Sequence, residues 1–422
     1  MTNEFEYLMR LVAASARGDW NDIQDADVNW ELIEQLAKDQ SVQFLLGYSL
    51  RKMPTSSCPD EIRQRLIQQM RSISMFNHAR TNEIVSLLND METAGIHNVM
   101  FKGWSVARYY AAPEARVSSD VDVWVAPKYE KKALAFLESR GFKIANKRWK
   151  NGHHSECYHS VLGQMDLHVI FYDELVEDVW FQKMDGNEFI NEPHLKVSDS
   201  VGTYYTLNYT DHLIYQFLHM AKHFIQTGLS LRIILDIAVF FSANKKSVDC
   251  QRVWDTINGL NYGELVNCVL WIAILYCGFS VEDFPGISVK APAQIQLILE
   301  DLEKGGWIGI NDKAAREEGW YEYNRQIMLK NMKPWEYNLR MFFWRHASIR
   351  HFFPDRQEMI KQYPWLKEKT LLLPAAWIYR LITKSIRRLF DGKATQGIIS
   401  EKTKISDSGK VRVEMFKELK MM

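Results

Sequence analysis

Two aspartates stand two residues apart in the segment RVSSDVDVWV, which spans residues 116–125. Valines alternate with polar residues there, a pattern typical of a half-buried strand. Side chains two residues apart in a strand point to the same face, so the carboxylates of Asp120 and Asp122 are expected to lie close together and repel each other. Such a pair costs stability unless a cation neutralises it.

A third carboxylate, Asp166, lies in the segment MDLHV, where apolar residues again flank the acidic one. If this segment forms a strand beside the first, the carboxylates of Asp120, Asp122 and Asp166 converge. Hard oxygen ligands favour Mg²⁺ or Mn²⁺, and two such ions roughly 3.5–4 Å apart can hold the attacking and leaving oxygens of phosphoryl or nucleotidyl transfer. For the first two aspartates alone, the alternative is an edge strand with solvated carboxylates.

The upstream segment VMFKGWSV places Gly103 and Ser105 after an expected strand and before an expected helix. A glycine lets backbone amides approach a phosphate, and a helix N-terminus favours negative charge. The Ser105 hydroxyl can donate a hydrogen bond, and Lys102 can supply a positive charge. The segment therefore predicts a phosphate-binding turn, although a simple strand-to-helix turn has the same pattern.

Four further polar residues accompany these segments. The guanidinium of Arg116 matches phosphate geometry, or it pairs with a nearby glutamate. His154 and Glu156 alternate on an expected strand and share a face, where Glu156 can act as a base or support a metal, or both can be solvated. His168 follows the third aspartate by two residues; it either orients that carboxylate and assists proton transfer, or is a hydrogen-bonded core histidine.

The composition sets the general class of protein. Lys plus Arg equals Asp plus Glu at 52 each, so no overall field would draw the chain to nucleic acid or a membrane. The five cysteines are scattered without C-x-x-C spacing, which indicates a reduced, cytoplasmic protein without a structural zinc site. The N-terminus lacks the apolar core of a signal peptide. The apolar segment LVNCVLWIAILYCGF is too short to span a membrane, so we expect a buried helix and no transmembrane segment.

Hydrophobic spacing divides the chain into four regions. Residues 1–90 show helical spacing, and residues 91–198 alternate strand and helix patterns. Residues 199–392 are again helical in pattern. Residues 393–422 are polar with few aromatic residues, so we expect a mobile tail without apolar anchors. The predicted fold class is α+β, a small mixed-sheet core embedded in a mainly helical framework.

Polar residues in the third region have several interpretations. His212, His219 and His223 share one face of an expected helix. They lack the glutamate of an H-E-x-x-H motif, so we expect them to pack beside the core and close its pocket rather than bind zinc. Arg232 and Asp236 stand four residues apart, and we expect a salt bridge between them.

Residues 371–390 combine apolar and basic side chains. Such a segment can lie on an anionic membrane surface or bind nucleic acid. We favour a helix that docks its apolar face on the protein and leaves its basic face in water.

The segment FKGWSVARYYAAPEARVSSDVDVWV resembles the signature of the bacterial uncharacterised nucleotidyltransferase family, within the DNA polymerase β-like nucleotidyltransferase superfamily. That signature has Lys-Gly, a tyrosine, an arginine and then Asp-x-Asp followed by apolar residues. HSECY, MDLHV, FLHMAKH and LRIILDIA match further, so the resemblance covers about residues 95–240. One departure is that a tryptophan separates the glycine from the serine, which are adjacent in the superfamily.

The resemblance implies specific roles for these residues. Asp120 and Asp122 are expected to bind metal, and Asp166 to complete the site. Gly103 and Ser105 are expected to contact the triphosphate. The implied core is that of a nucleotidyltransferase.

The implied reaction is metal-dependent nucleotidyl transfer. An NTP donates its nucleoside monophosphate to an acceptor hydroxyl, pyrophosphate is released, and Mg²⁺ or Mn²⁺ is the cofactor. Lys102 and Arg116 are expected to help bind the nucleotide. The acceptor can be a small molecule, a sugar, an RNA end or a protein. The alternative is a non-catalytic nucleotide-binding or scaffold protein that retains the fold, and the presence of all three aspartates argues against it.

Overall fold

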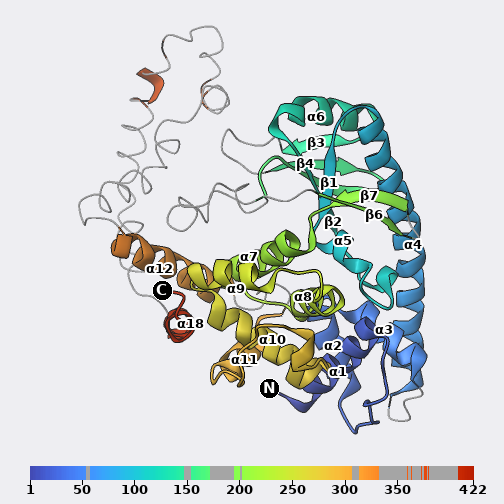
Figure 1. Cartoon of the computed structure of the whole chain (residues 1–422), viewed down its shortest axis with the longest axis vertical. Helices are drawn as coiled ribbons and strands as arrows, with labels where there is room; N and C mark the ends of the chain where they lie inside the picture. The colour runs from blue at the N-terminus through green and yellow to red at the C-terminus, as the bar shows by residue number, and fades with distance from the viewer. Residues whose placement is uncertain are drawn as a thin grey trace.

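The structure is a computed structural model. It describes residues 1–53, 58–146, 154–171, 194–199, 202–306, 313–331 and 407–422, with isolated positions between 359 and 379. Figure 1 shows a β-sheet region beside a larger body of helices. The long helix α4 (Asp60–Thr93) runs along both parts and joins them.

Five strands form the main sheet of the described chain, in the order β1-β2-β5-β4-β3. Their bounds are β1 Asn98–Phe101, β2 Asp120–Val125, β3 Lys143–Asn146, β4 His154–His159 and β5 Gly163–His168. β2 and β5 are parallel, whereas the other neighbouring pairs are antiparallel. The sheet is therefore mixed, and the α+β prediction is confirmed.

The sequence pattern did not indicate every strand. β3 was not expected, and neither was the hairpin of β6 (Leu195–Asp199) and β7 (Gly202–Thr206). These strands are four or five residues long, too short for an alternating pattern to stand out. Val197 and Tyr204 of the hairpin are nonetheless buried with side chains of α4.

Helices surround the sheet and build the rest of the molecule. Before the sheet come α1 Asn3–Arg17, α2 Trp30–Asp39, α3 Gln43–Lys52 and α4; within it lie α5 Gly103–Ala107 and α6 Glu130–Ser139; after it come α7 Tyr209–Gln226, α8 Leu231–Asn244, α9 Cys250–Gly259, α10 Gly263–Cys277, α11 Ile295–Gly305, α12 Lys313–Asn331 and α18 Asp407–Glu418. Apolar side chains of α1–α3 and α7–α11 belong to one buried cluster. These two stretches, far apart in the sequence, therefore share one core.

Two predictions are confirmed: a glycine follows the end of the long helix, and the apolar segment is a buried helix. α4 ends just before Gly95, which has a φ of 70° that favours glycine. The apolar segment expected to be buried forms α10, whose side chains lie in the core. None of the helices in the described part of the chain combines the length and the apolar character needed to cross a membrane.

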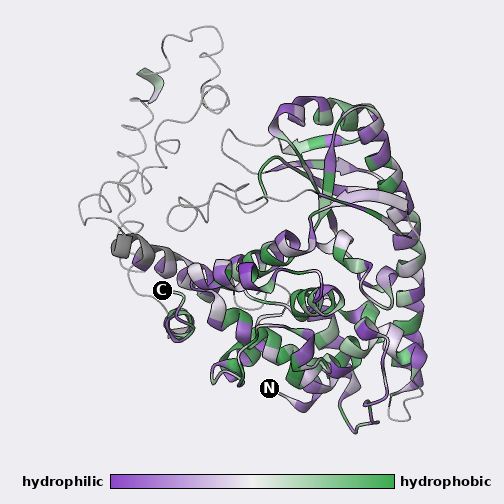
Figure 2. Ribbon diagram, viewed as in Figure 1, coloured by the Kyte–Doolittle hydropathy of each residue, from purple (hydrophilic) through white to green (hydrophobic). Residues whose placement is uncertain are grey.

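The two faces of the sheet have different surroundings. Val121 and Val123 pack with Leu88 of α4 and Leu137 of α6. Figure 2 shows apolar and polar residues alternating along α4, as expected for a helix with one buried face. Because strand side chains alternate, the aspartates of β2 lie on the opposite face, toward the helical body. This alternation places the predicted chemistry between sheet and helices.

The expectation of a mobile polar tail over 393–422 is wrong for residues 407–422. They form α18 and the residues after it, and Phe416, Leu419 and Met421 are fully buried. Phe416 packs its ring against Phe224 and Tyr323. The apolar residues are few, but helical spacing gathers them on one face. Residues 393–406, and most of 371–390, lie outside the described residues.

Candidate active site

The candidate site is built on neighbouring strands. Asp122 of β2 stands directly opposite Asp166 of β5 in the parallel register, and Glu156 of β4 follows opposite Asp166. Asp120 stands opposite Gln164. Parallel pairing of β2 and β5 thus brings Asp122 and Asp166 into one row across the sheet.

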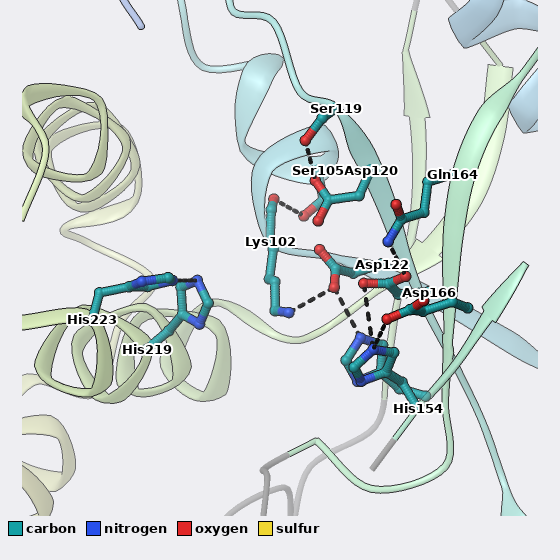
Figure 3. Close-up of polar contacts among 12 residues, drawn as sticks. Lys102, Ser105, Ser119, Asp120, Asp122, His154, Gln164, Asp166, His219 and His223 are labelled. Carbon is teal, nitrogen blue, oxygen red and sulfur yellow. Dashed lines mark hydrogen bonds and ion pairs between the residues drawn. The ribbon is translucent and has the colours of Figure 1, made fainter. Parts of the chain in front are cut away.

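Asp122 is buried and held by two donors (Figure 3). Its Oδ1 lies 2.6 Å from the Lys102 ammonium and 2.9 Å from His168 Nε2. Burial alone would raise the pKa of Asp122, but the Lys102 charge and the His168 contact hold it below its ordinary value. The Asp122 carboxylate is therefore ionised. Lys102 compensates part of the negative charge that Asp120 and Asp122 bring to the strand.

Asp166 has a different environment. Gln164 Nε2 donates to its Oδ1 at 2.8 Å, and His154 Nε2 lies 3.8 Å from its Oδ2. Burial, and secondarily the charge of Asp122, raise the pKa of Asp166 despite the Gln164 hydrogen bond. Two neighbouring carboxylates thus differ in proton affinity, an arrangement suited to acid–base work.

One group in the described chain has the spacing to hold a metal ion. Asp122, Asp166 and His168 each offer a ligand atom, and these atoms lie within 4.8 Å of one another. Asp120 is outside this group; it is half-buried on the same strand face, and the Ser119 hydroxyl lies 3.3 Å from its Oδ1. The structure therefore brings two of the three predicted carboxylates together with a histidine. His168 contacts Asp122 rather than Asp166.

The expected phosphate-binding turn has an unusual backbone. Lys102, between β1 and α5, has a φ of 59°, in the left-handed region. A Cβ at Gly103 would lie 2.4 Å from Arg116 Nη1, so a larger residue would displace that guanidinium. The Ser105 hydroxyl donates to the Lys102 carbonyl at 2.9 Å and lies 3.4 Å from His212 Nε2. Ser105 is thus buried and turned inward, whereas Lys102 and Gly103 reach the pocket described below.

The expected salt bridge between Arg232 and Asp236 gives way to a different pairing. Asp236 pairs with the buried Arg116, whose Nε lies 2.9 Å from Oδ1, and it accepts a 2.7 Å hydrogen bond from Tyr110. Arg232 donates instead to the Val117 carbonyl at 2.8 Å. Arg116 comes from the loop before β2. Helical spacing relates only residues of the same helix, so it could not predict this partner of Asp236.

A pocket of about 280 Å³ lies between β2, with the turn before α5, and the helices α7 and α8. Its polar lining comprises Lys102, Gly103, Arg116, Asp120 and Asp122 on the sheet side and Tyr215, Gln216, His219, His223, Arg232 and Asp236 on the helical side. A larger cavity of about 760 Å³ lies between α4 and the loop before β2 and shares Arg116 and Ser118 with this pocket. The smaller pocket is the candidate substrate site because Asp120 and Asp122 line it; of the group with metal-ligand spacing, Asp122 is the member that reaches it.

The predicted histidine face packs beside the core as expected. His219 and His223 line the pocket and contact each other through their Nε2 atoms at 3.1 Å (Figure 3). His212 is buried beside Ser105 and the Phe240 ring. Gln216 was not predicted, although it follows His212 by four residues and precedes His219 by three, on the same face.

Comparisons with known proteins give a family and two structural similarities. Residues 26–278 match the family described as uncharacterised nucleotidyltransferase. The solution structure of the antibiotic-resistance factor ANT(2'')-Ia is 10% identical, with a TM-score of 0.30, over 40% of this chain and 85% of that chain. The crystal structure of an antigenic nucleotidyltransferase-like protein from Paracoccidioides brasiliensis is 13% identical, with a TM-score of 0.28, over 39% and 77%. The search of curated proteins found no match.

The family match covers more than half of the chain, from α2 through α10. It includes both walls of the pocket and all three predicted aspartates. The chain therefore belongs to the uncharacterised nucleotidyltransferase family.

Proposed function

We propose that this protein transfers a nucleoside monophosphate from an NTP to an acceptor hydroxyl, with a divalent metal ion and with release of pyrophosphate. The observation that carries the proposal is the register of Asp122 beside Asp166, with a ligand atom of His168 within 4.8 Å of both. Membership of a nucleotidyltransferase family supports the reaction class.

The donor set fits a hard divalent cation such as Mg²⁺ or Mn²⁺. Asp122 and Asp166 supply carboxylate oxygens, which such cations prefer. The charge of Asp122 contributes to the raised pKa of Asp166, so Lys102 leaves part of the acidic pair uncompensated. Asp120, on the same pocket wall as Asp122, would supply a further oxygen. When bound, the ion would offset the negative charge that develops on the transferred phosphate.

The remaining roles belong to side chains of the chain itself. In the structure Lys102 contacts Asp122. When a metal ion takes its place beside that carboxylate, the Lys102 ammonium would be free to bind a phosphate oxygen. Arg116 is fixed by Asp236 and orders the Gly103 turn, where backbone amides can approach a phosphate. Asp166, which stands opposite Asp122 in the strand register, would accept the proton of the acceptor hydroxyl.

The test is transfer of label from NTPs with a labelled α-phosphate. The purified chain, Mg²⁺ and a cell extract are incubated with each of the four NTPs, and pyrophosphate is measured alongside. We expect an extract component to gain label and pyrophosphate to appear, both lost in Asp122→Asn. NTP binding without pyrophosphate release would favour the non-catalytic alternative, and the class of labelled molecule would identify the acceptor.

A further inference from the structure

The pocket has a charged wall on the sheet side and an uncharged wall formed by α7; α8 adds Arg232 and also Asp236, which is paired with Arg116. Lys102, Asp120 and Asp122 face it from the sheet side. Helix α7 contributes Tyr215, Gln216, His219 and His223. Figure 3 shows His219 and His223 across from Lys102 and Asp122. A ligand with one charged end and one neutral end would match both walls.

Gln216 is the least satisfied side chain of the uncharged wall. It is 7% exposed, and neither its amide nitrogen nor its carbonyl oxygen has a hydrogen-bond partner among the residues that the structure describes. A buried amide without partners is costly, so such a group in a pocket wall indicates a ligand that supplies them.

Apart from Arg232 and the paired Asp236, the α7 and α8 side chains that line the pocket are neutral. Val106 of α5 and Ile233 and Ile237 of α8 line the same pocket. Burial lowers the pKa of His223 to about 3 and lowers that of His219 well below its usual range, so both imidazoles are uncharged. These neutral side chains suit a flat, partly apolar group better than an ion.

We propose that Gln216 binds the nucleobase of the donor nucleotide through both atoms of its amide group. A phosphate or carboxylate offers only acceptors and would leave the Gln216 carbonyl oxygen unpaired. A nucleobase edge offers a donor beside an acceptor, which an amide can pair with bidentately. The inference rests on the proposed function, because it assumes that the charged wall takes the triphosphate.

The experiment compares ligands with and without a base. Mg²⁺ complexes of ATP, GTP, CTP, UTP and ribose 5-triphosphate, which has no base, are titrated calorimetrically into the full chain. The variants are Gln216→Met, which is similar in size, and Gln216→Asn, which keeps an amide but shortens its reach. The control is Gln226→Met, the same substitution in the last residue of α7. Thermal melting checks that each variant folds.

We expect wild type to bind at least one NTP about tenfold more tightly than ribose 5-triphosphate. Gln216→Met and Gln216→Asn should each reduce this advantage to about threefold or less and leave the affinity for ribose 5-triphosphate within about twofold. Gln226→Met should keep the full advantage.

Three results would overturn the inference while leaving the proposed function in place. The first is a wild type that binds NTPs and ribose 5-triphosphate equally. The second is a folded Gln216 variant that keeps the full advantage, as expected if the amide serves the acceptor. The third is a variant that loses affinity for ribose 5-triphosphate as strongly as for NTPs. A wild type that binds neither ligand with Mg²⁺ would overturn the proposed function and this inference together.

Discussion

Asp122 has a structural partner as well as a proposed chemical role. The Lys102 ammonium lies 2.6 Å from it, and the side chains of Lys102 and Asp122 are only 18% and 7% exposed. Asp120 has no comparable cation at that distance among the described residues. The two aspartates of the same motif therefore differ in what they contribute to the folded state, although their sequence context is alike.

Replacing each aspartate by asparagine should separate these contributions. Without metal, Asp122→Asn should lower the free energy of unfolding by about 2 kcal/mol, because Lys102 would remain buried without its charge partner. Asp120→Asn should change it by less than about 0.5 kcal/mol. Urea denaturation in the presence of a chelator measures both. Equal stabilities for the two variants would show that the Lys102–Asp122 pair is not maintained.

His212 should make stability depend on pH. Burial lowers its pKa from 6.5 to about 3; the charge of Arg108 adds to this and that of Asp236 opposes it. The unfolded chain therefore binds the proton more readily, so stability is complete above the ordinary pKa and falls as the pH drops below it. Between about pH 7 and pH 5, His212 should account for a loss of about 2 kcal/mol.

The measurement is urea denaturation of wild type and His212→Gln at both pH values. The variant should lose less stability than wild type over this interval. His219 and His223 remain in both proteins, so part of the acid sensitivity should persist. Identical losses in the two proteins would contradict the assignment to His212.

Helix α8 is tied to the sheet region by the pair of Arg116 and Asp236. Arg116 precedes β2, and its guanidinium also fixes the close approach to Gly103. We expect a double-mutant cycle of Arg116→Met and Asp236→Asn to give a coupling energy above about 1 kcal/mol. The cycle of Arg232→Met with Asp236→Asn serves as the comparison and should give less. A larger coupling for Arg232 would restore the salt bridge expected from helical spacing.

Helix α18 should contribute to stability through its buried face. Phe416→Ala should destabilise the protein by about 3 kcal/mol, because it removes a fully buried ring packed on Phe224 and Tyr323. Val411→Ala is the matched control, since Val411 is 69% exposed on the same helix. Thermal melting of both variants is the measurement. A Phe416→Ala melting temperature equal to that of the control would mean that α18 does not dock.

Sequence patterns predicted elements better than the contacts between them. β2, β5, α4 and α10 follow from alternation, helical spacing and a terminal glycine. The short strands β3, β6 and β7 have too few residues for the alternation of apolar and polar residues to be recognised. The partner of Asp236 and the inward turn of Ser105 depend on distant segments, which no local rule includes. The sequence predicted that Asp122 and Asp166 lie together only if their two strands are neighbours, and it did not show that they are.

At the scale of the whole molecule, the pocket joins two regions that are about a hundred residues apart in the sequence. The sheet supplies the acidic wall, and α7 and α8 supply the opposite wall. The shared core of α1–α3 with α7–α11 holds that opposite wall in place. Motifs identified the acidic wall, whereas the pairing of Asp236 with Arg116 and the amide of Gln216, unpaired among the described residues, became apparent only once the helices were in position.

The central claim is that the acidic wall binds a metal–nucleotide complex. The most direct measurement is calorimetric titration of Mg²⁺–NTP into wild type, Asp120→Asn and Asp122→Asn, with each protein first shown to be folded by melting. The account predicts saturable binding to wild type only when Mg²⁺ is present, and a loss of at least about tenfold in affinity for each variant, since each removes a carboxylate from the proposed metal site. Titration curves that are the same for all three proteins would contradict the account.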